Sequence, residues 1–169
     1  MPDREIAGVL TRMGAAQDLL SSTLRDDWAP FLRERGFQGS GRIFTLRDQT
    51  DWAMLGFQTS TGSTGDEAIF TINLMVAGKA AWDAAREKQR WLPARPSPNS
   101  VSAHRYQQRI GFLTHGRDHW WSSRGDGSNH AAIVGEVLNA LDEHAIPTLP
   151  REMADQSPGP RGTFAKHAT

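Results

Sequence analysis

The stretch AIFTINLMV, residues 68–76, decides the fold of this chain, because its side chains alternate more regularly than those of any other segment. Large apolar side chains occupy every second position, at Phe70, Ile72, Leu74 and Val76. The positions between them hold Thr71, Asn73 and Met75. Successive side chains of a strand point to opposite faces, so this period of two indicates a β-strand with a buried apolar face. The sequence therefore predicts a sheet that contains this segment.

Four further segments show the alternation of strands, two before this stretch and two after it: residues 42–47, 51–58, 105–112 and 119–123. The connectors between the first three strands are short and polar. They favour an antiparallel meander, because a parallel return needs a crossover of about a dozen residues or more. We expect an antiparallel sheet of about five strands.

Helical spacing of apolar residues occurs near the beginning, in the middle and near the end of the chain. The first segment predicts one bent helix or two short ones that end near Arg35, and the second covers residues 79–91. The third begins at Ser128 or Asn129 and ends before Pro147. Together the patterns predict a single α+β domain over residues 1–149, with the N-terminal, middle and C-terminal helices packed on one face of the sheet.

Two segments lack this periodicity. Residues 92–103 contain three prolines and are expected to form either a plain loop or a mobile rim over the sheet. Residues 150–169 are polar and interrupted by Pro and Gly, so they are predicted to form a disordered tail.

The composition narrows the class of protein. Lys and Arg together number 19, as do Asp and Glu, so the overall charge predicts neither nucleic acid nor an anionic membrane as a partner. Cysteine is absent, which excludes disulfides and thiolate chemistry and suits a reducing compartment. The first residues lack the apolar region of a signal peptide, and no apolar run reaches the roughly 20 residues that span a bilayer. A cytoplasmic protein is expected.

Six short motifs follow one another in a characteristic order along the chain. They are Gly36-Phe37, Phe44, QTS at 58–60, FTINLMV at 70–76, RIG at 109–111 and Trp120-Trp121. In this order they resemble the bacterial domain-of-unknown-function family 4304, over roughly residues 16–149. The resemblance implies a one-domain α/β-type fold and a cytoplasmic bacterial setting. It implies no catalytic residues, because the family carries no established activity.

No metal, nucleophile or cofactor motif is evident in the sequence. Histidines and carboxylates are closest together at His115, Asp118, His119, Asp126 and His130. The glycine after His115 indicates a turn, so these rings need not converge on a metal, and we expect solvent-exposed histidines instead. There is no Gly-x-Ser-x-Gly elbow and no P-loop lysine. We therefore expect no catalytic residue, no metal and no cofactor.

The candidate ligand-binding residues lie on the face of the sheet opposite the apolar one: Trp52, Gln58, Asn73, Arg105, Arg109 and Trp121. The two guanidinium groups and the two amides suit an anion or a carbonyl, and the indoles offer a flat surface for stacking. One of the adjacent residues Trp120 and Trp121 should enter the core, and the hypothesis places Trp121 on the polar face.

A structural interpretation of the same residues is also open. The arginines could pair with carboxylates such as Asp48 or Asp51, and the amides could bind the backbone of residues 92–103. Both tryptophans could be packing residues.

These patterns favour a non-catalytic binding domain whose polar-aromatic face recognises a partner protein or a small anionic ligand. One specific version is an immunity-like or accessory protein. The alternative is a small enzyme or ligand-binding protein that holds an anionic molecule through Arg105, Arg109, Gln58 and Asn73. In that case His104 or His119 would act as the base. A homodimer through this face would hide Trp52 and the outer indole.

Overall fold

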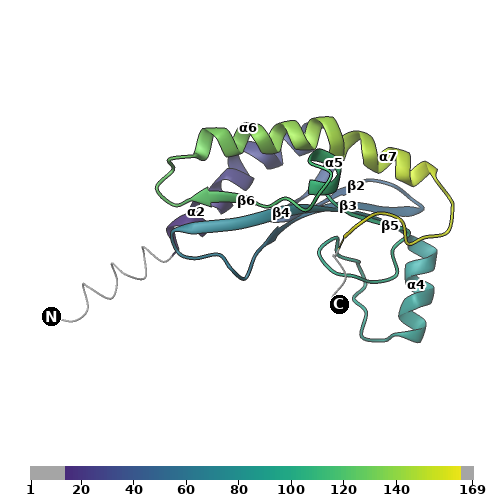
Figure 1. Cartoon of the computed structure of the whole chain (residues 1–169). Coiled ribbons are helices and arrows are strands. Elements are labelled where there is room, and N and C mark those ends of the chain that lie inside the picture. Colours follow the sequence, from purple (N-terminus) through teal and green to yellow (C-terminus); the bar gives the residue numbers. More distant parts are fainter. Residues whose placement is uncertain (1–13, 165–169) are drawn as a thin grey trace.

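The computed structural model describes residues 14–164, which form an antiparallel sheet of six strands with helices around it (Figure 1). The strands are β1 (Phe37–Ser40), β2 (Ile43–Leu46), β3 (Asp51–Thr59), β4 (Glu67–Gly78), β5 (Tyr106–Arg109) and β6 (Trp121–Arg124). The first five are neighbours in sequence order, while β6 pairs with the first half of β4 and β5 with its second half. The predicted α+β class and antiparallel sheet are confirmed.

Strand β1 is an element that the sequence did not indicate. Its residues FQGS contain only one buried side chain, Phe37, so no alternation of apolar residues predicts it. It pairs with β2 across a tight turn in which Gly41 has a φ of 68°. Glycine adopts this left-handed conformation without steric cost, which explains its place between the two strands.

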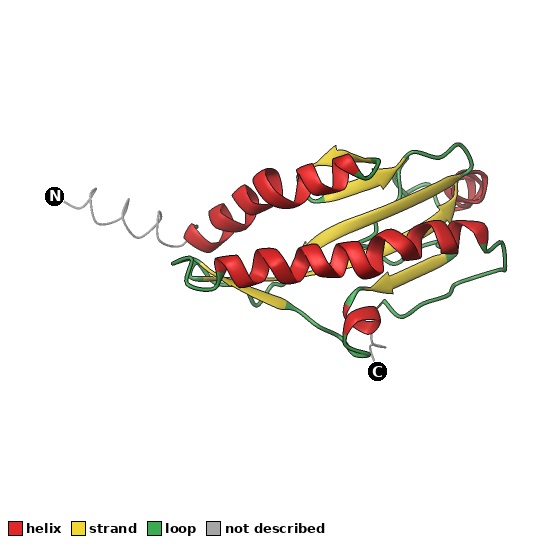
Figure 2. Ribbon diagram, turned by 90° about the horizontal axis from the view of Figure 1, so that it is seen from above, coloured by secondary structure: helices red, strands yellow, loops and turns green. Residues whose placement is uncertain are grey.

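Two long helical rods lie side by side on one face of the sheet (Figure 2). The first consists of α2 (Ala15–Thr23), η1 (Leu24–Trp28) and α3 (Ala29–Glu34). The second consists of α6 (His130–Ala140), η2 (Leu141–Ala145) and α7 (Ile146–Ala154). The part of the predicted first helix that precedes residue 14 lies outside the described residues.

Each rod contains a π-helical turn, η1 or η2, directly before a proline-containing turn. The amide of Ala29 donates to the carbonyl of Leu24, and the amide of Ile146 donates to that of Leu141, in each case five residues back. The prolines follow at Pro30 and Pro147. Proline cannot donate and its ring crowds the preceding turn, and the π turn widens the helix where this occurs. The predicted end before Pro147 is therefore wrong, because the second rod continues to Ala154.

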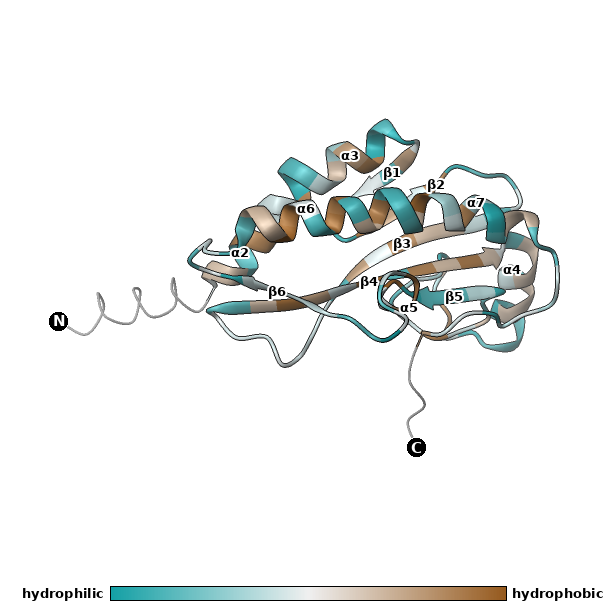
Figure 3. Ribbon diagram, turned by 45° about the horizontal axis from the view of Figure 1, so that its top comes forward, coloured by the Kyte–Doolittle hydropathy of each residue, from teal (hydrophilic) through white to brown (hydrophobic). Residues whose placement is uncertain are grey.

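The core lies between the two rods and the apolar face of β3, β4 and β5. Trp28 stacks on Phe57 with their ring centroids 5.4 Å apart, and Phe70 stacks on Trp121 at 5.6 Å. Figure 3 shows hydrophobic residues running along β3 and β4 and recurring between hydrophilic ones along α6. The alternation that predicted these strands therefore places their apolar side chains under the rods.

The middle helix, α4 (Lys79–Lys88), lies on the other side of the sheet from the two rods (Figure 1). It differs in this respect from the expectation of three helices on one face. Trp82 is its one buried residue, and the indole donates to the carbonyl of Pro93 at 3.0 Å. The helix thus lacks the broad apolar stripe with which the two rods cover the core.

The segment after α7 also differs from the prediction of a disordered tail. Residues 155–164, which we call the C-terminal strap, lie beside β5 and form a parallel bridge between Arg161 and Tyr106. The amides of Gln107 and Arg109 donate to the carbonyls of Arg161 and Thr163. Backbone hydrogen bonds hold the strap, and such bonds do not depend on the type of side chain. The polar composition of these residues therefore could not reveal that they are ordered. Residues 165–169 of the predicted tail lie outside the described residues.

A short helix, α5 (Gly111–Thr114), follows β5 where the sequence predicts a longer strand. None of the helices within residues 14–164 is both long enough and apolar enough to cross a membrane.

Candidate functional site

The polar face predicted from the sequence exists, and its centre is a cluster of three side chains. Asn73 of β4 lies opposite Arg109 of β5 in the strand register. Its Nδ2 donates to Oε1 of Gln58 at 2.7 Å, and its Oδ1 accepts from Nε of Arg109 at 3.3 Å. The structure thus brings together Gln58, Asn73 and Arg109 as expected, on the face opposite the main core.

This cluster is covered by residues 89–104, which we call the covering loop. Asn99 of the loop accepts a hydrogen bond from Nδ2 of Asn73 at 2.9 Å and donates to the carbonyl of Phe57 at 3.2 Å. Gln107 of β5, which is buried, donates to the carbonyls of Pro98 and Ser100, each at 3.0 Å. The amides of the face therefore bind the protein's own loop, as the structural interpretation allowed.

A glycine in β3 allows the covering loop to approach the sheet this closely. A Cβ atom on Gly56 would lie 2.6 Å from Cγ of Pro98 and 2.7 Å from Oδ1 of Asn99. Both distances are shorter than van der Waals contact, so the loop and a larger residue could not occupy this place together. The loop is therefore packed directly on the sheet at Gly56.

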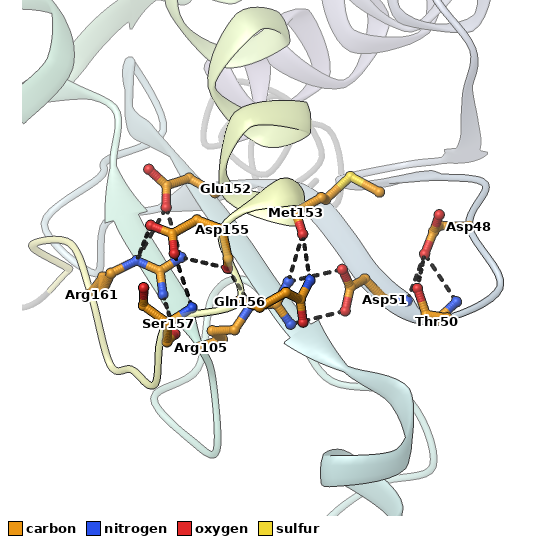
Figure 4. Close-up of polar contacts among 10 residues, drawn as sticks. All are labelled: Asp48, Thr50, Asp51, Arg105, Glu152, Met153, Asp155, Gln156, Ser157 and Arg161. Atoms are coloured by element: carbon orange, nitrogen blue, oxygen red, sulfur yellow. Dashed lines mark hydrogen bonds and ion pairs between the residues drawn. The ribbon is translucent and has the colours of Figure 1, made fainter.

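Arg105 is held between β3 and the end of α7 (Figure 4). Its two Nη atoms donate to the carboxylate of Asp51 at 3.0 and 2.9 Å, and the two side chains are only 13% and 7% exposed. It also donates to the carbonyls of Met153 and Asp155, each at 3.1 Å. The hydrogen bonds with Asp51 raise the pKa of Arg105 above its ordinary value. This guanidinium group links β3 to the end of α7 and uses four of its five N–H donors within the protein.

Arg109 is also paired within the protein. Its Nη1 lies 3.0 Å from a carboxylate oxygen of Asp118, and its side chain is 11% exposed. The rings of Trp120 and Phe164 lie 4.9 and 5.2 Å from its guanidinium carbon. Phe164 belongs to the C-terminal strap, so a segment predicted to be disordered closes one side of this residue.

The two predicted tryptophans do not join the cluster. Trp121 is buried in the main core against Phe70, so its assignment to the polar face is wrong, and Trp120 is the outer indole. Strand β6 is paired with β4 in a register that turns Trp121 toward the rods. Trp52 pairs with Ala77, four residues along β4 from Asn73. The ammonium nitrogen of Lys79 and the guanidinium carbon of Arg95 lie 4.7 and 5.1 Å from the centroid of its ring.

His104 belongs to the covering loop and does not face an open site. It is 6% exposed, stacks on Trp82 with ring centroids 5.9 Å apart, and its Nε2 lies 2.9 Å from the carbonyl of Ser100. Burial lowers the pKa of His104 below its ordinary value. The structure thus gives this residue a role in holding the loop.

A second place of interest is a pocket of about 370 Å³ between the second rod and the segment that joins α5 to β6. Its polar lining residues are Thr114, His115, His119, Glu136, Asn139, Glu143 and His144. We call it the histidine pocket. The sequence gave a sign of it only in the neighbouring His115 and His119, because Glu136, Glu143 and His144 follow more than 15 residues later.

The rings of His115 and His119 stack in this pocket with centroids 4.0 Å apart and an interplanar angle of 18°. A Cβ on Gly111 would collide with the backbone of His119, so this glycine lets the turn close and places the ring. Burial, followed by the neighbouring His115, lowers the pKa of His119. Its Nε2 is buried and has no hydrogen-bond partner within residues 14–164. Those residues contain no group of three or more histidines and carboxylates placed to hold a metal ion.

Comparison with known families finds a match to the model described as Domain of unknown function (DUF4304), over residues 28–151 of the 169. No curated protein and no solved structure matches the chain.

Proposed function

The chain belongs to the DUF4304 family, and from this premise we propose that it is a non-catalytic binding domain that recognises an acidic surface of a partner protein. The proposed contact surface is the layer formed by α4 and the covering loop, residues 79–104. The exposed indole of Trp91 in this layer is the observation that carries the proposal.

Positive charge is concentrated in this layer. Its cationic residues are Lys79, Arg86, Lys88, Arg90 and Arg95, and its acidic residues are Asp83 and Glu87. The layer therefore has a net charge of +3 with His104 neutral, whereas the whole chain has a net charge of zero. Complementary charge steers association and favours partners of the opposite sign.

The covering loop also exposes apolar side chains. Trp91 is 75% exposed and Val101 is 69% exposed, and these are the large hydrophobic residues that stand out as exposed among residues 14–164. Tryptophan and arginine are the residue types that most often dominate the energy of protein interfaces. An exposed tryptophan among arginines thus supports a protein partner.

The internal pairing of the arginines weighs against the second hypothesis, an anionic small molecule at Arg105 and Arg109. Such a ligand would have to break two ion pairs and displace the covering loop. Nucleic acid is also disfavoured, because α4 alternates the acidic residues Asp83 and Glu87 with its three cations and so offers no continuous row of positive charge to a phosphate backbone.

An immunity-like or accessory role is the narrower version of this proposal, in which the protein acts by covering part of its partner. A bacterial, cytoplasmic setting belongs to the same proposal, and the absence of cysteine from the sequence suits the reducing compartment that this setting implies.

The test begins with a photo-cross-linking amino acid placed at position 91 in cells that make the protein, with the same amino acid at the exposed Asp26 as a control. A cross-linked partner is then purified, and its affinity is measured for the normal chain and for Trp91→Ala. We expect a loss of about 30-fold or more for Trp91→Ala, and weaker binding as salt is raised.

Three results would overturn the proposal. The first is a cross-link to a second copy of this chain alone, which would make the layer a homodimer interface. The second is unchanged affinity in Trp91→Ala, and the third is recovery of nucleic acid instead of protein at position 91.

A further inference from the structure

The histidine pocket carries a charge opposite in sign to that of the proposed contact surface. Glu136 and Glu143 supply two carboxylates, and no lysine or arginine occurs among the residues that line it in the described part of the chain. With its imidazoles neutral, the pocket has a net charge of −2. A cation is therefore the ligand that its electrostatics favour.

The second rod presents these groups together. Glu136 lies on α6, whereas Glu143 and His144 lie on the π turn η2. π turns within α-helices occur frequently at functional sites. At this turn the rod meets the stacked pair His115 and His119 across the pocket.

His119 shows that the pocket wall has an unused hydrogen-bonding group. Its Nε2 is buried without a partner among residues 14–164, while its ring stacks on that of His115 and lies perpendicular to that of Trp121, with centroids 5.1 Å apart. Buried polar atoms nearly always have a partner, so an orphaned atom at a pocket wall indicates a missing ligand or water.

We propose that the histidine pocket binds an organic cation through a guanidinium group. The guanidinium plane would stack on the imidazole pair, and its N–H groups would reach the carboxylates of Glu136 and Glu143. A planar guanidinium offers five donors in a fixed geometry, whereas an ammonium group is a compact, strongly hydrated charge.

Two observations favour this class of cation over others. The described histidines and carboxylates are not grouped closely enough to hold a metal ion, so the ligand must bridge a wider space. The volume of about 370 Å³ lies at the small end of the range for ligand pockets, which suits one arginine-sized group.

The test uses agmatine as a free guanidinium compound and a blocked Gly-Arg-Gly peptide as a guanidinium on a chain, titrated at a pH of about 8, where imidazoles are neutral. Tighter binding of agmatine would identify a small-molecule ligand, and tighter binding of the peptide would identify an arginine side chain. We expect saturable binding and movement of the NMR signals of the His115 and His119 ring protons.

Substitutions localise the binding. Glu136→Gln and Glu143→Gln should each weaken agmatine binding about three- to fivefold, and the double variant more than about tenfold. Both glutamates are exposed, so these variants should fold, which the thermal midpoint checks. Glu143→Asp keeps the charge and should retain most of the affinity, and Glu87→Gln on α4 is the matched control.

The proposal is overturned if neither guanidinium probe saturates by about 10 mM, or if the double variant binds within about twofold of the normal chain. It is also overturned if 1,4-diaminobutane binds as tightly as agmatine, or if Zn²⁺ binds and agmatine does not. None of these results depends on Trp91, so the outcome is separate from that of the proposed function.

Discussion

At the scale of single residues, the two arginines show how a site that looks free in a sequence can be closed in the fold. Arg105 and Arg109 lie on the predicted face, but Asp51 and Asp118 neutralise them. If Arg109 were a free ligand-binding residue, as the sequence suggests, Arg109→Ala would leave the fold intact and abolish binding of the partner. The structure indicates an effect on stability instead.

Arg109→Ala should lower the free energy of unfolding by about 2–3 kcal/mol, because it leaves Asp118 and Asn73 without their shared donor. The value is below that for a fully buried pair because the Asp118 side chain is one-third exposed. Urea denaturation measures the change. Arg117→Ala, at a neighbouring exposed residue, should change stability by no more than about 0.5 kcal/mol. Equal effects of the two variants would contradict this account.

His104 and His119 predict how stability depends on pH. Burial lowers the pKa of both rings in the folded protein, so below the ordinary value of 6.5 the unfolded chain binds more protons. The free energy of unfolding should therefore fall as the pH drops through 6.5. Denaturation at a series of pH values measures the slope, which should become shallower in His104→Gln and in His119→Gln. A slope that neither substitution changes would rule out both residues as its source.

At the scale of elements, the covering loop determines whether the polar face of the sheet is an open binding site or a buried part of the fold. Three prolines made residues 92–103 recognisable as a connector, but its position depends on close packing against Gly56 and on contacts of Asn99. Contacts between residues so far apart in the chain leave no periodic signal in the sequence.

Gly56→Ala should loosen the covering loop, because the new methyl group collides with Pro98 and Asn99. We expect a loss of about 1–3 kcal/mol in the free energy of unfolding and faster hydrogen exchange in residues 89–104. Gly135→Ala is the control, since a Cβ there meets no atom within 4 Å. It should raise stability by up to about 1 kcal/mol, as alanine does in a helix. Unchanged exchange in the loop of Gly56→Ala would show that the loop does not depend on this contact.

The sequence could predict the elements that bury one face. The alternating residues of β3 and β4 and the helical spacing of the rods each follow from local periodicity. It could not predict β1, which has one buried side chain, or the continuation of the second rod through Pro147. At the candidate site, the meander placed Gln58, Asn73 and Arg109 together, but nothing local showed which carboxylates or which loop would occupy them.

At the scale of the whole molecule, the C-terminal strap closes the sheet at its β5 edge. Arg161 ties the strap to α7 through Glu152, with Nη2 of the arginine 2.9 Å from the carboxylate (Figure 4). The carbonyl groups of the strap accept hydrogen bonds from the backbone amides of Gln107 and Arg109, which would have no partner if β5 were an edge strand. Open edges pair readily with other chains.

Removal of residues 156–169 should therefore expose the β5 edge and cause self-association. We expect a lower thermal midpoint and a sedimentation coefficient that rises with protein concentration. Arg161→Ala keeps the backbone of the strap and should lower the thermal midpoint without self-association. A shortened chain that stays monomeric at all concentrations would show that the strap does not protect this edge.

The limits of the matched family region do not coincide with those of the folding unit. A fragment cut to residues 28–151 would start at the last residue of η1 and stop within α7. It would lack Leu20 and Leu24 of the core and the whole strap. Such a fragment should be unstable or insoluble, and shared sequence is thus a poor guide to where this protein can be trimmed.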